Sequence, residues 1–225
     1  MKIKRLYLPV IFCFILIPFC SAQKSKTELS MEKAGFENIR EKDPNIKVSL
    51  MYGRPDNFTG KLLYTDLHQA YLHPKALAAL IKAQKILKKY NTDYSLIVFD
   101  AARPMSIQQR MWDAVKGTSK SPYVSNPSHG GGLHNYGLAV DISIANEKGD
   151  TIDMGTKVDY LGKRAHIDNE ALMVKKGWMS NKARENRLLL RKVMREAGFH
   201  ALRSEWWHFN YCSRATAKAH YKVIH

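Results

Sequence analysis

The stretch GLHNYGLAVDISIA, residues 132–145, places a histidine seven residues before an aspartate at the start of an apolar segment. Residues 138–145 have the composition of a strand. Gly137 and Ala139 are small, and glycine permits close approaches and backbone angles that other residues resist. We therefore expect His134 and Asp141 to border a pocket in which the small residues leave room for an occupant.

A second group of polar residues lies in RSEWWHFNY, residues 203–211, which is predicted to be the final strand. Two histidines and a carboxylate can hold a catalytic zinc ion and leave a fourth position for water. His134, Asp141 and His208 would provide this set, with Glu205 as the general base for the zinc-bound water. Residues three apart in a straight strand face opposite sides, so a bend or bulge must separate Glu205 from His208.

Each of these histidines alone is more often a hydrogen-bonded structural residue than a ligand. Trp206 and Trp207 are expected to form core and pocket wall, because their large apolar area is most easily satisfied by packing.

The segment FDAARP, residues 99–104, follows an apolar run and carries Asp100 and Arg103. An arginine here could stabilise an oxyanion, a contribution of ~2.7–4 kcal/mol for one donor. Asp100 would orient the arginine toward the substrate. The alternative is a structural ion pair at the mouth of a loop.

The other segments indicate an α+β fold with a largely antiparallel central sheet flanked by helices, because strands and helices mix without regular βαβ alternation. Apolar periodicity predicts strands at 46–52, 94–100 and 138–145, and helices at 74–90, about 106–115 and 184–197. Residues 23–45 form a polar leader, and residues 117–132 a long loop of the kind that often covers a binding site.

The N-terminus has the pattern of a secretory signal. Basic residues at positions 2, 4 and 5 precede an apolar run that is shorter than the ~20 residues of a membrane span, and Ala22 offers a cleavage site. We expect residues 1–22 to be a signal peptide and residues 23–225 a single catalytic domain, exported to the periplasm without a transmembrane span. Phe19 disfavours lipoprotein anchoring through Cys20.

The chain is strongly basic, with a net charge of +16 and three cysteines. Only Cys212 remains after cleavage, so no internal disulfide is expected. For an exported protein, this charge favours contact with peptidoglycan or other wall polyanions over nucleic acid. A solvated basic surface is the alternative.

Together these motifs resemble the D-alanyl-D-alanine dipeptidases of the VanX type. These are zinc metallopeptidases that share a fold with D-Ala-D-Ala carboxypeptidases and the hedgehog signalling domain. The pattern S-x-H-x-x-G-x-A-x-D matches residues 132–141, and E-x-W-H matches residues 205–208. Further matches are NFTG at 57–60, D-x-x-R-P at 100–104 and DMGTKVD at 153–159.

The resemblance implies one zinc ion per chain, bound by His134, Asp141 and His208. It makes Glu205 the catalytic base and has Arg103 polarise the carbonyl under attack. Asp159 matches an acid that binds the free ammonium of the substrate, and we group Asp100 with it as substrate-binding. Two departures stand out: Gly132 replaces the serine of the pattern, and Val158 stands where an aromatic residue is usual.

The expected activity is hydrolysis of the D-Ala-D-Ala dipeptide in cell-wall turnover or dipeptide recovery. Two alternatives remain open. One is a D,D- or L,D-carboxypeptidase that trims peptidoglycan stem peptides, and the other is a zinc-holding wall-binding protein without catalysis.

Overall fold

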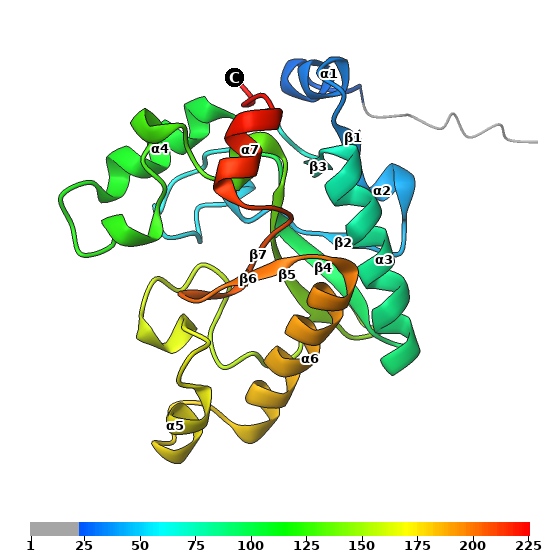
Figure 1. Cartoon of the computed structure of the whole chain (residues 1–225), viewed down its shortest axis with the longest axis vertical. Coiled ribbons are helices and arrows are strands. Elements are labelled where there is room, and N and C mark those ends of the chain that lie inside the picture. The colour runs from blue at the N-terminus through cyan, green and yellow to red at the C-terminus, as the bar shows by residue number, and fades with distance from the viewer. Residues whose placement is uncertain (1–22) are drawn as a thin grey trace, which may run out of the picture.

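A five-stranded β-sheet flanked by helices forms the centre of the protein (Figure 1). The structure is a computed structural model that describes residues 23–225. The signal peptide expected at residues 1–22 lies outside the described residues. Within residues 23–225, no helix is both long and apolar enough to cross a lipid bilayer.

The order of strands in the main sheet differs from their order in the chain. It runs β2 (Lys47–Val48), β4 (Ser95–Asp100), β5 (Ala139–Ala145), β7 (Glu205–Asn210) and β6 (His200–Leu202). The pairs β4–β5, β5–β7 and β7–β6 are antiparallel, whereas the edge strand β2 is parallel to β4. The sheet is therefore mixed, which modifies the prediction of a largely antiparallel sheet. A separate two-stranded sheet joins β1 (Glu37–Asn38) to β3 (Tyr71–Leu72).

Two long amphipathic helices, α3 (Pro74–Tyr90) and α6 (Asn181–Ala197), pack against each other and contribute buried residues to the main core. Pro74 occupies the first turn of α3, where its missing N–H is not needed. Helix α6 begins three residues before the predicted start, because Ser180 caps it by accepting a hydrogen bond from the Ala183 N–H. Both predicted helices are confirmed.

The remaining helices are α1 (Lys26–Lys33), α2 (Ile39–Lys42), α4 (Met105–Val115), α5 (Glu170–Lys175) and α7 (Arg214–His220). Helix α4 and the long loop 117–132 lie where predicted, and the loop contains only short 3₁₀ turns. Helix α1 belongs to the segment expected to be a polar leader. Its buried Glu28 accepts hydrogen bonds from the N–H groups of His68 and Gln69, which hold the helix on the protein.

The strand predicted over residues 46–52 is wrong in length, since only β2 forms there. The Tyr52 carbonyl accepts hydrogen bonds from the N–H groups of Leu63 and Tyr64, which draws the chain away from the sheet. Met51 and Tyr52 are thereby buried in a second core cluster. The alternation of apolar and polar residues could not reveal this distant partner.

Gly137 does not leave room for an occupant, contrary to the sequence interpretation. Its φ is 63°, and a Cβ there would lie 2.5 Å from Phe36 Cε1 and 3.0 Å from the His73 backbone nitrogen. Ala139 is likewise fully buried in the main core. Glycine is needed at position 137 because the chain turns tightly between His134 and β5 under the ring of Phe36.

Gly137→Ala should lower the free energy of unfolding by about 3 kcal/mol, since it adds a left-handed strain of ~1–3 kcal/mol to an overpacked contact. Gly177→Ala is the matched control, because Gly177 has φ 70° and nothing within 4 Å of the added Cβ. We expect the control to cost about 1 kcal/mol. Denaturant unfolding of both variants measures the difference, and equal losses would show that the Phe36 contact is unimportant.

Candidate metal centre and active site

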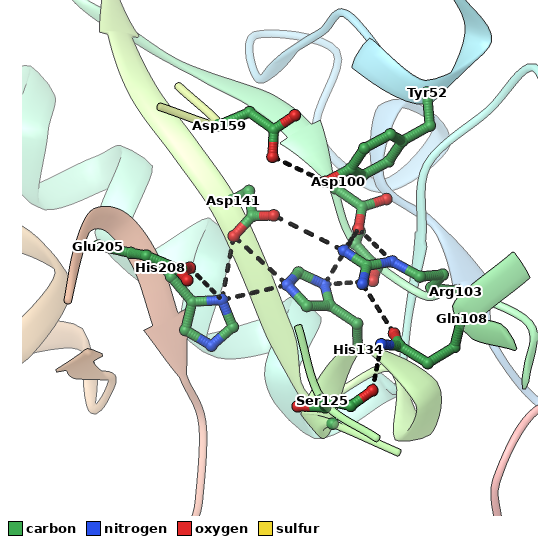
Figure 2. Close-up of polar contacts among 12 residues, drawn as sticks. Tyr52, Asp100, Arg103, Gln108, Ser125, His134, Asp141, Asp159, Glu205 and His208 are labelled. Carbon is green, nitrogen blue, oxygen red and sulfur yellow. Dashed lines mark hydrogen bonds and ion pairs between the residues drawn. The ribbon is translucent and has the colours of Figure 1, made fainter. Parts of the chain in front are cut away.

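The pairing of β5 with β7 brings together residues that are far apart in the sequence. Asp141 lies directly opposite His208 in the register, and His134 precedes β5 in a 3₁₀ turn. His134 Nε2 lies 3.2 Å from His208 Nδ1, and these nitrogens lie 3.3 and 3.0 Å from Asp141 Oδ1 (Figure 2). The three predicted metal ligands therefore converge on one point.

The hydrogen bonds of the two histidines show what this point can bind. His134 Nδ1 lies 2.7 Å from the Ala101 carbonyl oxygen, and His208 Nε2 lies 2.9 Å from Asn210 Oδ1. Because both oxygens are acceptors, the outer nitrogens carry the hydrogens and the inner nitrogens present lone pairs. These two nitrogens and an oxygen of the Asp141 carboxylate all lie within 4.8 Å of one another. Three electron-pair donors this close together favour a bound cation, and this set of donors suits zinc. The residues present therefore fit the predicted metal.

Glu205 lies beside this cluster. The register between β6 and β7 shifts at the start of β7, which is the irregularity that the spacing of Glu205 and His208 demands. Glu205 Oε2 consequently lies 3.9 Å from His208 Nδ1. Burial raises the pKa of Glu205 to about 7, so this carboxyl can accept and release a proton near neutral pH. Trp206 and Trp207 are buried, and Trp207 also lines the pocket.

Arg103 is held rigidly behind the cluster. Its Nε donates to Asp100 Oδ2 over 2.9 Å, and its Nη1 donates to Gln108 Oε1 over 2.8 Å. Burial alone would lower the pKa of Arg103, but the adjacent Asp100 raises it well above the ordinary value, and the guanidinium stays charged. Nη2 lies 3.8 Å from Asp141 Oδ2, so the charge of Arg103 lies close to the candidate metal ligands.

Asp100 orients Arg103, as predicted, but the geometry does not support its grouping as a substrate-binding residue. It is fully buried, and its second oxygen accepts a hydrogen bond of 2.5 Å from the Tyr64 hydroxyl. The carboxylate is therefore enclosed by protein groups.

Asp159 lies in a strained segment, and its side chain lines the same cavity as His134, Asp141 and His208. It is the one non-glycine residue with positive φ within residues 23–225, at 69°, and such strain is concentrated at functional sites. Its oxygens accept hydrogen bonds from the Tyr52 hydroxyl, at 3.1 Å, and from the Phe58 N–H, at 2.9 Å. Burial raises the pKa of Asp159 to about 7 despite these donors. Among residues 23–225, no cationic side chain forms an ion pair with Asp159.

A cavity of about 580 Å³ contains all of the predicted site residues except Asp100. Its lining includes His134, Asp141, His208, Glu205, Arg103 and Asp159. A larger cavity of about 940 Å³, between α1 and residues 220–225, contains none of these side chains.

Four further residues at the site were not singled out from the sequence. Three of them form hydrogen bonds: Tyr52 with Asp159, Gln108 with Arg103, and Tyr123 with His166. The fourth, Ser125, packs against Gly132. The sequence predicts only a strand, a helix and a loop at these positions. No local pattern marks them, because each acquires its partner through the tertiary fold.

Comparison with known proteins identifies relatives over most of the chain. A family model described as D-ala-D-ala dipeptidase matches residues 32–225. A D-alanyl-D-alanine dipeptidase of Escherichia coli is 32% identical over 166 residues, which cover 74% of this chain and 79% of that protein. Proteins of the same name from Enterococcus faecalis and Synechocystis are each 26% identical, over 78% and 62% of this chain and 90% and 68% of their own lengths. The chain belongs to the D-ala-D-ala dipeptidase family, Peptidase_M15.

Proposed function

We propose that this protein hydrolyses the D-Ala-D-Ala dipeptide with one zinc ion held by His134, Asp141 and His208. The observation that carries the proposal is the convergence of three ligand atoms beside the carboxyl group of Glu205. Burial raises the pKa of this carboxyl group to about 7. The names of the relatives, all D-alanyl-D-alanine dipeptidases, support the substrate.

Zinc, when bound, lowers the pKa of a coordinated water to about 7 and polarises a carbonyl oxygen. Glu205 then accepts a proton from the attacking water and delivers a proton to the leaving amine. Arg103, fixed by Asp100 and Gln108, stabilises the negative charge that develops on the carbonyl oxygen. Arg103 needs no reorientation for this role, because its hydrogen bonds already hold the guanidinium.

Asp159 binds the free ammonium group of the dipeptide. An ammonium would compensate the charge of this buried carboxylate, whereas an acylated amine would leave it unpaired. This difference selects a dipeptide over a longer stem peptide.

A D,D- or L,D-carboxypeptidase remains the second candidate, and it would prefer the acylated substrate. A wall-binding protein without catalysis is the third, although a base and an arginine beside the metal ligands have no purpose in such a protein. Wild-type assays with free and N-acetylated D-Ala-D-Ala distinguish the three.

The cellular setting extends the proposal. We place residues 1–22 as a signal peptide and residues 23–225 as one catalytic domain of the hedgehog and D,D-peptidase fold type, active in the periplasm. Wall turnover or dipeptide recovery suits this location. Contact with wall polyanions is supported only by the basic charge of the chain.

Glu205→Gln should keep the zinc but lose about 10²–10⁴-fold in kcat, because the metal ligands remain and the proton acceptor is gone. His208→Ala should lose both the zinc and the activity. Metal analysis and D-Ala-D-Ala hydrolysis on the same samples test this separation. Wild-type kcat in Glu205→Gln would rule out Glu205 as the base.

Asp159→Asn should raise KM for D-Ala-D-Ala about tenfold or more, the value of a charge-assisted hydrogen bond, and change kcat little. Asparagine tolerates the left-handed conformation, so the backbone should be preserved. The N-acetylated dipeptide is the control substrate, and its KM should not rise in the variant. An equal loss with both substrates would contradict ammonium binding by Asp159.

The pH dependence of KM should follow the protonation of the Asp159 carboxyl group. Because burial raises the pKa of Asp159 to about 7, the protonated form prevails below pH 7 and must lose its proton to pair with the ammonium. Wild-type KM should therefore rise as pH falls below 7, and should rise again above about pH 8, where the substrate amine deprotonates. Asp159→Asn should lose the acid-side rise. Parallel KM profiles for the two proteins would exclude Asp159 as its source.

A further inference from the structure

The space beside Gly132 is filled by the side chain of Ser125. Gly132 has an extended backbone, with φ −106°, which any residue can adopt, so its conformation does not require glycine. A Cβ at position 132 would lie 2.8 Å from Ser125 Oγ and 3.3 Å from Ser125 Cβ. The loop thus brings a serine hydroxyl to the place where the S-x-H pattern of the family carries a serine side chain.

The backbone of Ser125 is anchored to the catalytic arginine. Its carbonyl oxygen accepts a hydrogen bond of 2.8 Å from Gln108 Nε2, and Gln108 Oε1 accepts one of 2.8 Å from Arg103 Nη1. Ser125 is half-buried and lines the same cavity as the metal ligands. Among residues 23–225 its hydroxyl has no hydrogen-bond partner, so it is available to a ligand.

The position of Ser125 identifies which part of the dipeptide it would meet. Figure 2 shows Asp159 and Ser125 on opposite sides of the three metal ligands. A dipeptide with its ammonium at Asp159 and its amide at the metal extends its leaving residue, and therefore its carboxylate, toward Ser125. Arg214 lines the same cavity and donates a hydrogen bond of 3.0 Å to the His129 carbonyl of this loop, which adds positive charge beside it.

We propose that the Ser125 hydroxyl binds the C-terminal carboxylate of the substrate and thereby replaces, from loop 117–132, the serine that Gly132 lacks. This inference rests on the proposed function, because it takes the dipeptide as substrate. It makes Ser125 a specificity-determining residue for a free carboxylate.

Hydrolysis of D-Ala-D-Ala and of D-Ala-D-alaninamide by a set of variants tests the proposal. Ser125→Ala should raise KM for the dipeptide about tenfold and lower kcat less than threefold, because one hydrogen bond to a charged group is lost. It should have little effect on the amide, which lacks the carboxylate. Ser119→Ala, an exposed serine of the same loop, is the control and should behave as wild type.

Two double variants separate the hydroxyl from the packing. Ser125→Gly combined with Gly132→Ser returns the hydroxyl from position 132 and should recover KM to within about threefold of wild type. Ser125→Gly combined with Gly132→Ala fills the same space without a hydroxyl and should keep the high KM. Zinc content and thermal melting of every variant confirm folding and metal binding.

The outcomes are distinct from those for the proposed function. If wild-type protein does not cleave D-Ala-D-Ala, the proposed function and this inference both fail. If wild type cleaves it, but Ser125→Ala keeps the wild-type KM or the two double variants behave alike, only the role of Ser125 is overturned.

Discussion

The register between β5 and β7 is the constraint on which the site depends. It sets Asp141 opposite His208, while the next pairing, between β4 and β5, sets Asp100 opposite Asp141. A slip of one residue would turn Asp141 to the other face of the sheet and separate it from both histidines. The buried apolar residues of β5 oppose such a slip, so the packing of the core also fixes the positions of the candidate metal ligands.

The charged groups of the cavity also favour a bound cation. Asp100 and Asp141 lie within ion-pair distance of the buried Arg103, and Asp159 and Glu205 line the cavity that Arg103 also lines. Burial raises the pKa of both Glu205 and Asp159 to about 7, because desolvation outweighs the neighbouring groups that lower it, such as His208 beside Glu205 and the Phe58 N–H that bonds Asp159. A divalent cation beside Asp141 and an ammonium beside Asp159 would restore the balance. These two positive charges are those of the metal ion and the substrate ammonium that we propose.

The sequence predicted those parts of the site that local patterns encode. The spacing in GLHNYGLAVD and EWWH singled out the three side chains that converge in the structure, and strand stereochemistry correctly demanded an irregularity between Glu205 and His208. The contacts of Asp159 with Tyr52 and Phe58, about a hundred residues away, have no local signal. The same holds for the parallel pairing of β2 and for the contact of Phe36 with Gly137, because both depend on how distant segments pack.

Metal content measured together with D-Ala-D-Ala hydrolysis, before and after chelation, tests the central claim most directly. We expect about one zinc ion per chain, loss of hydrolysis when a chelator removes it, and recovery when zinc is returned to the same sample. Full hydrolysis by protein shown to be free of metal would contradict it.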